Sequence, residues 1–160
     1  MDPEKTHSDQ YQFNLVMKYG LLATAGYVVV FFIMSLLNLH IIPELRGLNY
    51  LILLITASVA INTFKKQSQN QMSYLKGFLT GLFVAILSFA FFALLMYIYL
   101  KFLDPEFLQF IVDYSPMGIT LTPLSAALLL FMEGQAVGIV SALILMQFFK
   151  KNINKISKTI

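Results

Sequence analysis

One acidic side chain lies inside a long apolar stretch and is the first candidate for chemistry. Glu133 falls in the run 119–149, 17 residues before Lys150, which places it about 25 Å along a helix from that lysine. An ionised carboxylate at the centre of a bilayer costs on the order of 3 kcal/mol. Glu133 is therefore either a proton-binding, cation-binding or substrate-contacting group, or a neutral acid hydrogen-bonded to a nearby hydroxyl or amide. Both interpretations stay open, and we favour the second.

Other polar groups do not assemble into a recognisable centre. The chain has no cysteine, and its two histidines, His7 and His40, are far apart, so no metal cluster is predicted. No glycine-rich phosphate loop follows a strand, and no serine has an assignable base. Gln135 joins Glu133 as a candidate intramembrane polar site, while Asn38 and Asn62 are candidates for bonds between helices. We expect no catalytic residue, no cofactor and no enzymatic activity.

Four apolar runs must position these groups, and each is long enough to cross a membrane. A span needs roughly 20 residues for about 30 Å of hydrocarbon, and 58% of this chain is hydrophobic while 12% is charged. A soluble four-helix bundle would show a polar stripe on each helix, and residues 77–100 show none. The sequence predicts an all-α polytopic transmembrane bundle. Its helices are predicted at about 17–39, 48–64, 76–100 and 119–149, within a domain of 15–152 that follows a polar cytoplasmic tail (1–14) and precedes a basic one (153–160).

Basic residues predict the orientation of this bundle. Nine of the eleven lysines and arginines fall on one set of alternating segments and two on the other. Because basic segments stay in the cytoplasm, both termini and the loop 65–76 are predicted inside. The placement of the charges explains the net charge of +3 better than binding to nucleic acid does, and nucleic acid is not an expected partner. The predicted topology anchors are Lys65, Lys66, Lys76, Lys150 and Lys151.

Small residues at a spacing of four predict how the third and fourth helices associate. Lipid tails are as apolar as leucine, so membrane helices associate by close packing and polar contacts rather than by the hydrophobic effect. Two ladders of small residues allow such close packing, and we expect them to face each other. They are Gly77, Gly81 and Ala85 in the third helix and Gly134, Gly138 and Ala142 in the fourth.

The segment 104–114 predicts a short helix on the outer surface, between the third and fourth spans. Asp104 suits the N-cap, and Pro105 suits the first helical position. A loop anchored by aromatic side chains is an equally acceptable interpretation.

Three stretches of the chain carry a resemblance to known proteins. They are Met17-Lys18-Tyr19-Gly20-Leu21-Leu22, Ser73-Tyr74-Leu75-Lys76-Gly77-Phe78 with Gly81, and Tyr99-Leu100-Lys101-Phe102-Leu103-Asp104-Pro105-Glu106-Phe107-Leu108. With these stretches the chain resembles an uncharacterised family of four-helix membrane proteins that is common in Bacteroidetes, domain of unknown function 4199. The resemblance covers roughly residues 15–152, and it implies a bacterial inner-membrane location and no established activity. The chain departs from the family in a longer polar N-terminal tail and in Pro116 and Pro123 before the fourth helix.

Three classes of function fit these features. The favoured one is a non-catalytic scaffold or accessory subunit of a membrane complex, in contact with the bilayer and with a second copy or another membrane protein. The alternative is a small transporter or channel-like oligomer that uses Glu133. A membrane enzyme is the least favoured, because it would require several converging titratable groups.

Overall fold

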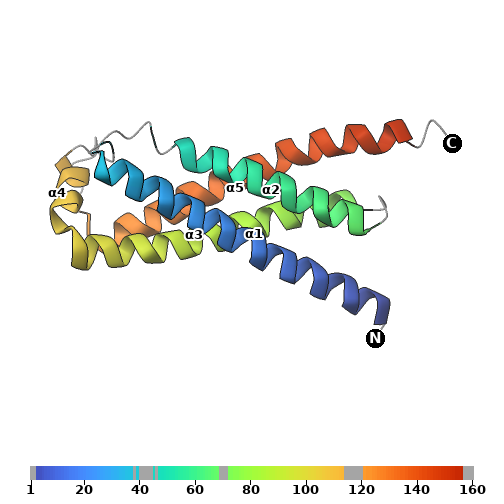
Figure 1. Ribbon diagram of the computed structural model, residues 1–160, viewed down its shortest axis with the longest axis horizontal. Coiled ribbons are helices and arrows are strands. Elements are labelled where there is room, and N and C mark those ends of the chain that lie inside the picture. The colour runs from blue at the N-terminus through green and yellow to red at the C-terminus, as the bar shows by residue number, and fades with distance from the viewer. Residues whose placement is uncertain are drawn as a thin grey trace.

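The computed structural model describes residues 3–37, 39, 45, 47–68, 72–113 and 121–156, with side chains described between 9 and 149 within those ranges. These residues form helices and contain no strand (Figure 1). The helices are α1 (Pro3–Leu36), α2 (Gly47–Gln67), α3 (Tyr74–Ile98), a π-helical turn η2 (Tyr99–Leu103), α4 (Pro105–Asp113) and α5 (Pro123–Ile156).

Four of these helices are long and apolar enough to cross a membrane. Many of their large apolar side chains are exposed, and in no span is more than 44% of the most apolar window buried within the protein. A soluble protein rarely exposes apolar surface of this extent, whereas lipid covers it in a bilayer. The predicted transmembrane bundle is therefore confirmed. The spans are Asp9–Leu36, Gly47–Gln67, Tyr74–Leu103 and Pro123–Phe149.

Consecutive spans run in opposite directions. The start of α1, the end of α2, the start of α3 and the end of α5 lie at one end of the bundle, and α4 lies at the other end (Figure 1). We call these the terminal end and the α4 end. Lys65, Lys66 and Lys76 belong to the last turn of α2 and the first turn of α3, so these three predicted anchors share the terminal end.

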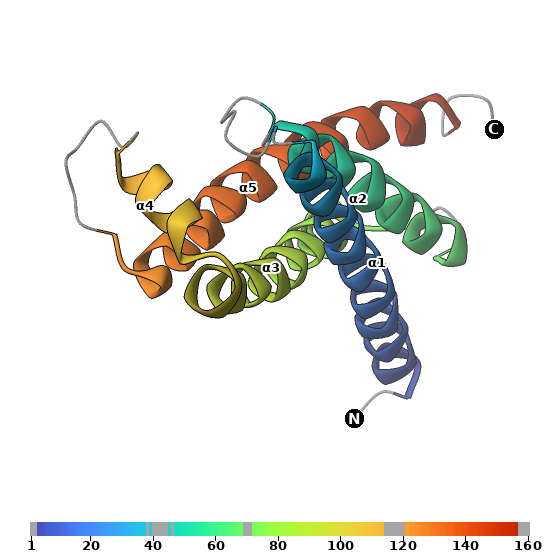
Figure 2. The same cartoon turned by 60° about the vertical axis from the view of Figure 1, so that its left-hand side comes forward.

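The third span is the centre of the bundle, because α3 contacts α1, α2 and α5 and takes part in the two most extensive contacts between spans, those with α5 and with α1. Its buried side includes Val84, Phe89 and Phe92, while Leu94 and Phe83 are exposed. The first half of α1 diverges from the other helices toward the terminal end (Figure 2). The two sides of α3, one toward α5 and one toward α1, are packed in different ways.

On the α5 side, the two ladders of small residues lie against each other in one antiparallel register. A Cβ atom at position 138 would lie 2.5 Å from the Ala85 Cβ, and one at position 81 would lie 3.2 Å from the Ala142 Cβ. Carbon atoms that are not bonded make their best contact at about 3.5–4.0 Å. The absence of side chains at these positions therefore sets the close approach of α3 and α5. The ends of the register pair Gly77 with Met146 and Gly134 with Phe89.

On the α1 side, buried hydroxyl groups connect the helices. The Thr24 hydroxyl donates to the carbonyl oxygens of Gly20 (3.0 Å) and Ser88 (3.2 Å). The Ser88 hydroxyl donates to the Ala85 carbonyl (3.1 Å) and lies 3.3 Å from the Tyr27 hydroxyl. Tyr27 and Ser88 are completely buried. These bonds satisfy polar groups that would otherwise be costly in an apolar interior.

The N-terminal boundary differs from the prediction of a polar tail over residues 1–14. Helix α1 begins at Pro3, a residue that suits the first helical position. The Gln12 side chain donates to the Thr80 hydroxyl (2.9 Å) and to the Lys76 carbonyl (3.2 Å), and Tyr11 packs against the core. The polar residues of this segment are thus taken up by contacts to α3, which the composition of the segment alone could not reveal.

The boundaries of the last span differ as well. The prediction began the helix at residue 119, and α5 begins at Pro123. Thr122 and Ser125 form a reciprocal cap, in which the Thr122 N–H donates to the Ser125 hydroxyl (2.8 Å) and the Ser125 N–H to the Thr122 hydroxyl (3.2 Å). Such a cap followed by proline fixes a helix start. At the other end α5 continues to Ile156, into the segment predicted as a basic tail.

Candidate functional site

The intramembrane acid bonds to a neighbouring helix. The Tyr50 hydroxyl of α2 donates a hydrogen bond to Glu133 Oε1 of α5. Tyr50 is partly buried, whereas Glu133 is exposed on the outside of the bundle, among exposed apolar side chains such as Leu129 and Met132. We call this pair the Glu133–Tyr50 clasp, because it joins α2 to α5. These two helices contact each other less extensively than α3 and α5 do.

The spans on either side of the clasp indicate how far along the bundle Glu133 lies. Glu133 is the eleventh residue of the 27-residue α5 span, ten residues from its start and three before its midpoint. The adjacent Gly134 packs against Phe89, near the midpoint of the α3 span. Tyr50, in contrast, is in the first turn of α2, a span of 21 residues that is only just long enough to cross. The acid therefore lies nearer the middle of the bundle than its α4 end, at a level that the shorter α2 reaches with its first turn.

Gln135, the second residue of the predicted polar site, does not join the clasp. At about 100° per residue it lies on nearly the opposite side of α5 from Glu133. Its Nε2 atom is buried, as is the Oδ1 atom of Asn49, and neither has a hydrogen-bond partner among the described residues. Asn62 is exposed on α2. Asn38 and His40 lie outside the described residues, as does the His7 side chain.

At the α4 end, Asp104 organises the turn out of the third span. Its backbone N–H donates to the Tyr99 carbonyl (3.0 Å), which closes the wide turn of η2. Its Oδ1 atom accepts from the Phe107 N–H (3.0 Å), and its Oδ2 atom accepts from the Tyr99 hydroxyl (3.1 Å). The predicted N-cap at Asp104 and the predicted short helix are therefore both confirmed. The alternative interpretation, a loop anchored by aromatic side chains, is wrong.

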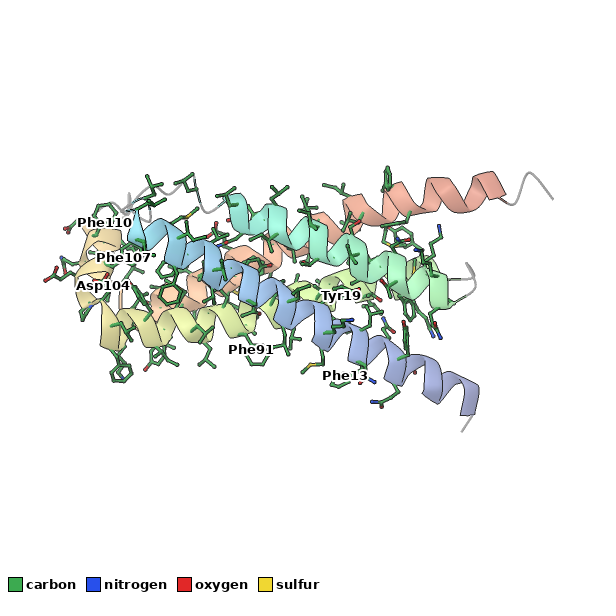
Figure 3. The ribbon with its side chains drawn as sticks, in the orientation of Figure 1. Phe13, Tyr19, Phe91, Asp104, Phe107 and Phe110 are labelled. Carbon is green, nitrogen blue, oxygen red and sulfur yellow. The ribbon has the colours of Figure 1, made fainter. Side chains whose placement is uncertain are left out.

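Aromatic rings hold α4 against the end of the bundle. The Phe31 and Tyr99 rings meet edge to face with centroids 5.0 Å apart, and the Phe107 ring of α4 lies 6.4 Å from the Tyr99 ring. Phe107 and Phe110, both labelled on α4 in Figure 3, have ring centroids 6.4 Å apart. Such arrangements are favoured by the ring quadrupoles. The sequence predicted the short helix α4 but not the π-helical turn before it, for which the residues gave no signal.

The predicted topology anchors have different environments. The Lys65 side chain is 7% exposed, and its Nζ atom lies 5.9 Å from the centroid of the Phe149 ring. Lys66 is exposed, and Lys76 forms an ion pair with Asp9, with Nζ and Oδ1 3.6 Å apart. The side chains of Lys150 and Lys151 lie outside the described part of the chain.

The arrangement offers little for chemistry within the described side chains. They contain no group of three or more His, Cys, Asp or Glu residues that could hold a metal ion. A groove of about 340 Å³ lies between α1 and α3, and most of its lining is apolar. No sequence pattern predicted this groove, because the residues on its α1 side include part of the segment taken for a tail.

Comparison with known proteins places the chain in a family. No curated protein and no solved structure matches it. A family model described as "Protein of unknown function (DUF4199)" matches residues 18–151, which include all four spans except the beginning of the first. The stretches that carried the resemblance in the sequence fall within this range or at its edge. The chain therefore belongs to the DUF4199 family of proteins of unknown function.

Proposed function

We propose that this protein is a non-catalytic scaffold or accessory subunit of a complex in the bacterial inner membrane. The observation that carries the proposal is the Glu133–Tyr50 clasp, in which the acid of the fourth span accepts a bond from a neighbouring helix. A carboxyl group used in this way stabilises the packing of helices. The hydroxyls of Thr24, Tyr27 and Ser88 are likewise engaged between helices.

The exposed side of the clasp supports a partner in the membrane. Glu133 faces outward beside Leu129 and Met132, which are 57% and 66% exposed. Hydrocarbon solvates a carboxyl group poorly, so a polar side chain from a partner helix would find a favourable contact there. A partner that packs over α5 at this level would complete the surroundings of Glu133.

Replacing Glu133 with Gln tests this role. The amide oxygen of Gln accepts the Tyr50 hydrogen bond, so we expect Glu133→Gln to retain its thermal stability and the proteins that co-purify with it in mild detergent. Glu106→Gln, at an exposed acid of α4, is the matched control. Purification of the wild-type chain from native membranes without any stoichiometric partner would overturn the accessory role.

The alternative is a small transporter or channel-like oligomer, and the outward exposure of Glu133 is what favours it, since copies that meet at α5 would bring their acids together. Under this alternative, Glu133→Gln folds normally but loses proton or cation flux in proteoliposomes. Flux through the wild-type protein that disappears in Glu133→Gln and persists in Glu106→Gln would replace the scaffold proposal.

Both termini are proposed to be cytoplasmic. The proposal is supported by Lys65, Lys66 and Lys76, which share the terminal end with the start of α1 and the end of α5 (Figure 1). Because the chain has no cysteine, Ser68→Cys provides a single label between α2 and α3. We expect this thiol in intact cells to resist a reagent that cannot cross the inner membrane and to react after the membrane is opened. Labelling in intact cells would reverse the orientation.

A further inference from the structure

The groove between α1 and α3 has the form of a site for one lipid chain. It encloses about 340 Å³, at the lower end of the roughly 300–1,000 Å³ that ligand pockets occupy. Its α1 side extends over nine residues, from Asp9 to Met17, and the rise between the first and the last is about 12 Å along the helix. The apolar residues of its lining are Phe13, Val16, Met17, Phe83, Ile86 and Leu87.

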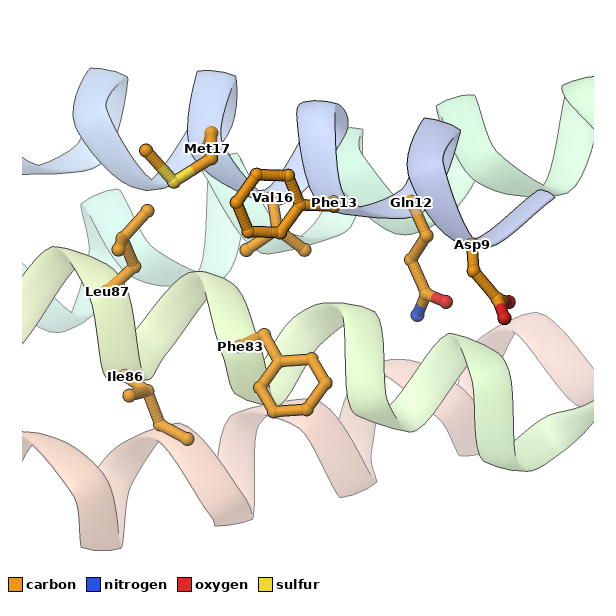
Figure 4. Close-up of a pocket in the computed structure, with 8 residues that line it drawn as sticks. All are labelled: Asp9, Gln12, Phe13, Val16, Met17, Phe83, Ile86 and Leu87. Atoms are coloured by element: carbon orange, nitrogen blue, oxygen red, sulfur yellow. The ribbon is translucent and has the colours of Figure 1, made fainter. Parts of the chain in front are cut away.

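The polarity of the groove follows the helix axes. Asp9 and Gln12 lie at one end, while Met17 and Leu87 lie at the other (Figure 4). The polar end is the terminal end of the bundle, where the chain leaves the hydrocarbon. A ligand seated here would have its polar group at the membrane surface and its apolar part toward the interior, which is the orientation of a bilayer lipid.

Two opposite charges stand at the polar end. Asp9 Oδ1 and Lys76 Nζ are 3.6 Å apart, and their side chains are 59% and 39% exposed, so both are accessible to a headgroup. An ethanolamine headgroup carries an ammonium that can donate to a carboxylate and a phosphate that can accept from an ammonium. A choline headgroup has no N–H to donate, and a glycerol headgroup has no cation for Asp9.

We propose that the groove binds a phospholipid with an ethanolamine headgroup, with one acyl chain between α1 and α3, the amine on Asp9 and the phosphate on Lys76. Bonded in this way, the lipid would join the diverging first half of α1 to α3. The bond from Gln12 to Thr80 holds the two helices together beside the polar end of the groove, so the site exists before the lipid enters.

Native mass spectrometry of the full-length protein tests the headgroup. The delipidated protein is offered phosphatidylethanolamine, phosphatidylcholine or phosphatidylglycerol with the same acyl chains. Because exposed charge pairs contribute modestly, we expect about threefold more bound ethanolamine lipid than either other lipid. Asp9→Asn should remove this preference and leave acyl binding in place. Equal binding of the three lipids, or a preference for the glycerol lipid, would overturn the headgroup assignment.

A photoreactive acyl chain tests the groove without altering the protein. Ethanolamine lipid with a diazirine on its chain should label peptides that contain residues 13–17 and 83–87. Ile86→Trp, which fills the groove, should reduce this labelling, whereas Leu94→Trp at an exposed position of α3 outside the groove should not. Labelling spread evenly over all exposed spans in the wild-type protein would overturn the site, even if Ile86→Trp failed to fold.

Discussion

Helix α3 packs against α5 through small residues and against α1 through buried hydroxyl groups. Toward α5 the two helices fit so closely that a Cβ at position 134 would lie 2.2 Å from an atom of the Phe89 ring. Toward α1 the contact relies on Thr24, Tyr27 and Ser88 and then opens into a groove. The close contact leaves no room for change, whereas the hydrogen-bonded contact tolerates separation along part of its length. We expect α3 and α5 to act as one rigid unit and α1 to adjust against it.

The largest expected effect comes from a side chain forced into the α3–α5 contact. Gly138→Leu places a large group where a Cβ atom alone would lie 2.5 Å from the Ala85 Cβ. Overpacking commonly costs about 1–3 kcal/mol, and we expect at least the upper value because the Ala85 Cβ is bonded to the α3 backbone and cannot rotate away. Thermal unfolding in detergent measures the change.

Gly47→Leu is the matched control, since a Cβ at position 47 meets nothing within 4 Å. Gly81→Leu should be the intermediate case, because a Cβ there would lie 3.1 Å from the flexible end of Ile61 and 3.2 Å from the Ala142 Cβ, farther than the 2.5 Å found at position 138. Equal thermal stability of Gly138→Leu and Gly47→Leu would show that the register of small residues does not hold α5 in place.

A smaller effect is expected on the α1 side. Ser88→Ala removes the group that lies 3.3 Å from the buried Tyr27 hydroxyl. Hydrogen bonds between membrane helices contribute about 0.6 kcal/mol on average, and the stranded tyrosine hydroxyl adds to the loss, so we expect about 1 kcal/mol.

A double-mutant cycle separates this bond from general effects of each substitution. Once Ser88 is Ala, Tyr27→Phe should cost little or nothing further, because its partner is already absent. Strictly additive losses in the two single variants and the double variant would mean that the Tyr27 and Ser88 hydroxyls do not interact.

The sequence predicts the membrane spans of this protein better than it predicts the contacts of individual side chains. Apolar runs predict the four spans because hydrocarbon thickness fixes a minimum length, and the spacing of Gly81 and Gly138 indicated the surface on which α3 meets α5. The partner of Glu133 was left open among several residue types, since the level at which α2 lies beside α5 depends on the whole bundle. Nothing in the sequence around Tyr50, in the first turn of α2, indicated that its hydroxyl would bond to Glu133.

The first turns of α1 are a part of the fold that the sequence did not predict. Residues 9–14 include Asp9, Gln10, Gln12 and Asn14, and this polar composition favours a solvated tail. Gln12 bonds to Thr80 and Lys76 only because the start of α3 lies beside it. There the Thr80 hydroxyl and the Lys76 carbonyl are within reach of its side chain. Contacts between polar groups 60 or more positions apart leave no periodic signal. The sequence therefore predicted neither the helical start of α1 nor the groove that this segment lines.

The smallest expected effect tests whether α1 is the adjustable element. Gln12→Ala removes the bonds to Thr80 and the Lys76 carbonyl, a loss of about 0.6 kcal/mol that hardly changes global unfolding. Spin labels on Gln10→Cys and Leu75→Cys, both exposed and in a chain without native cysteine, report the separation of α1 from α3. We expect a broader and longer distance distribution in Gln12→Ala and no change in Gln147→Ala, at an exposed glutamine of α5. An unaltered distribution in Gln12→Ala would mean that apolar packing alone positions the first half of α1, and the contrast between the two sides of α3 would then be confined to its middle.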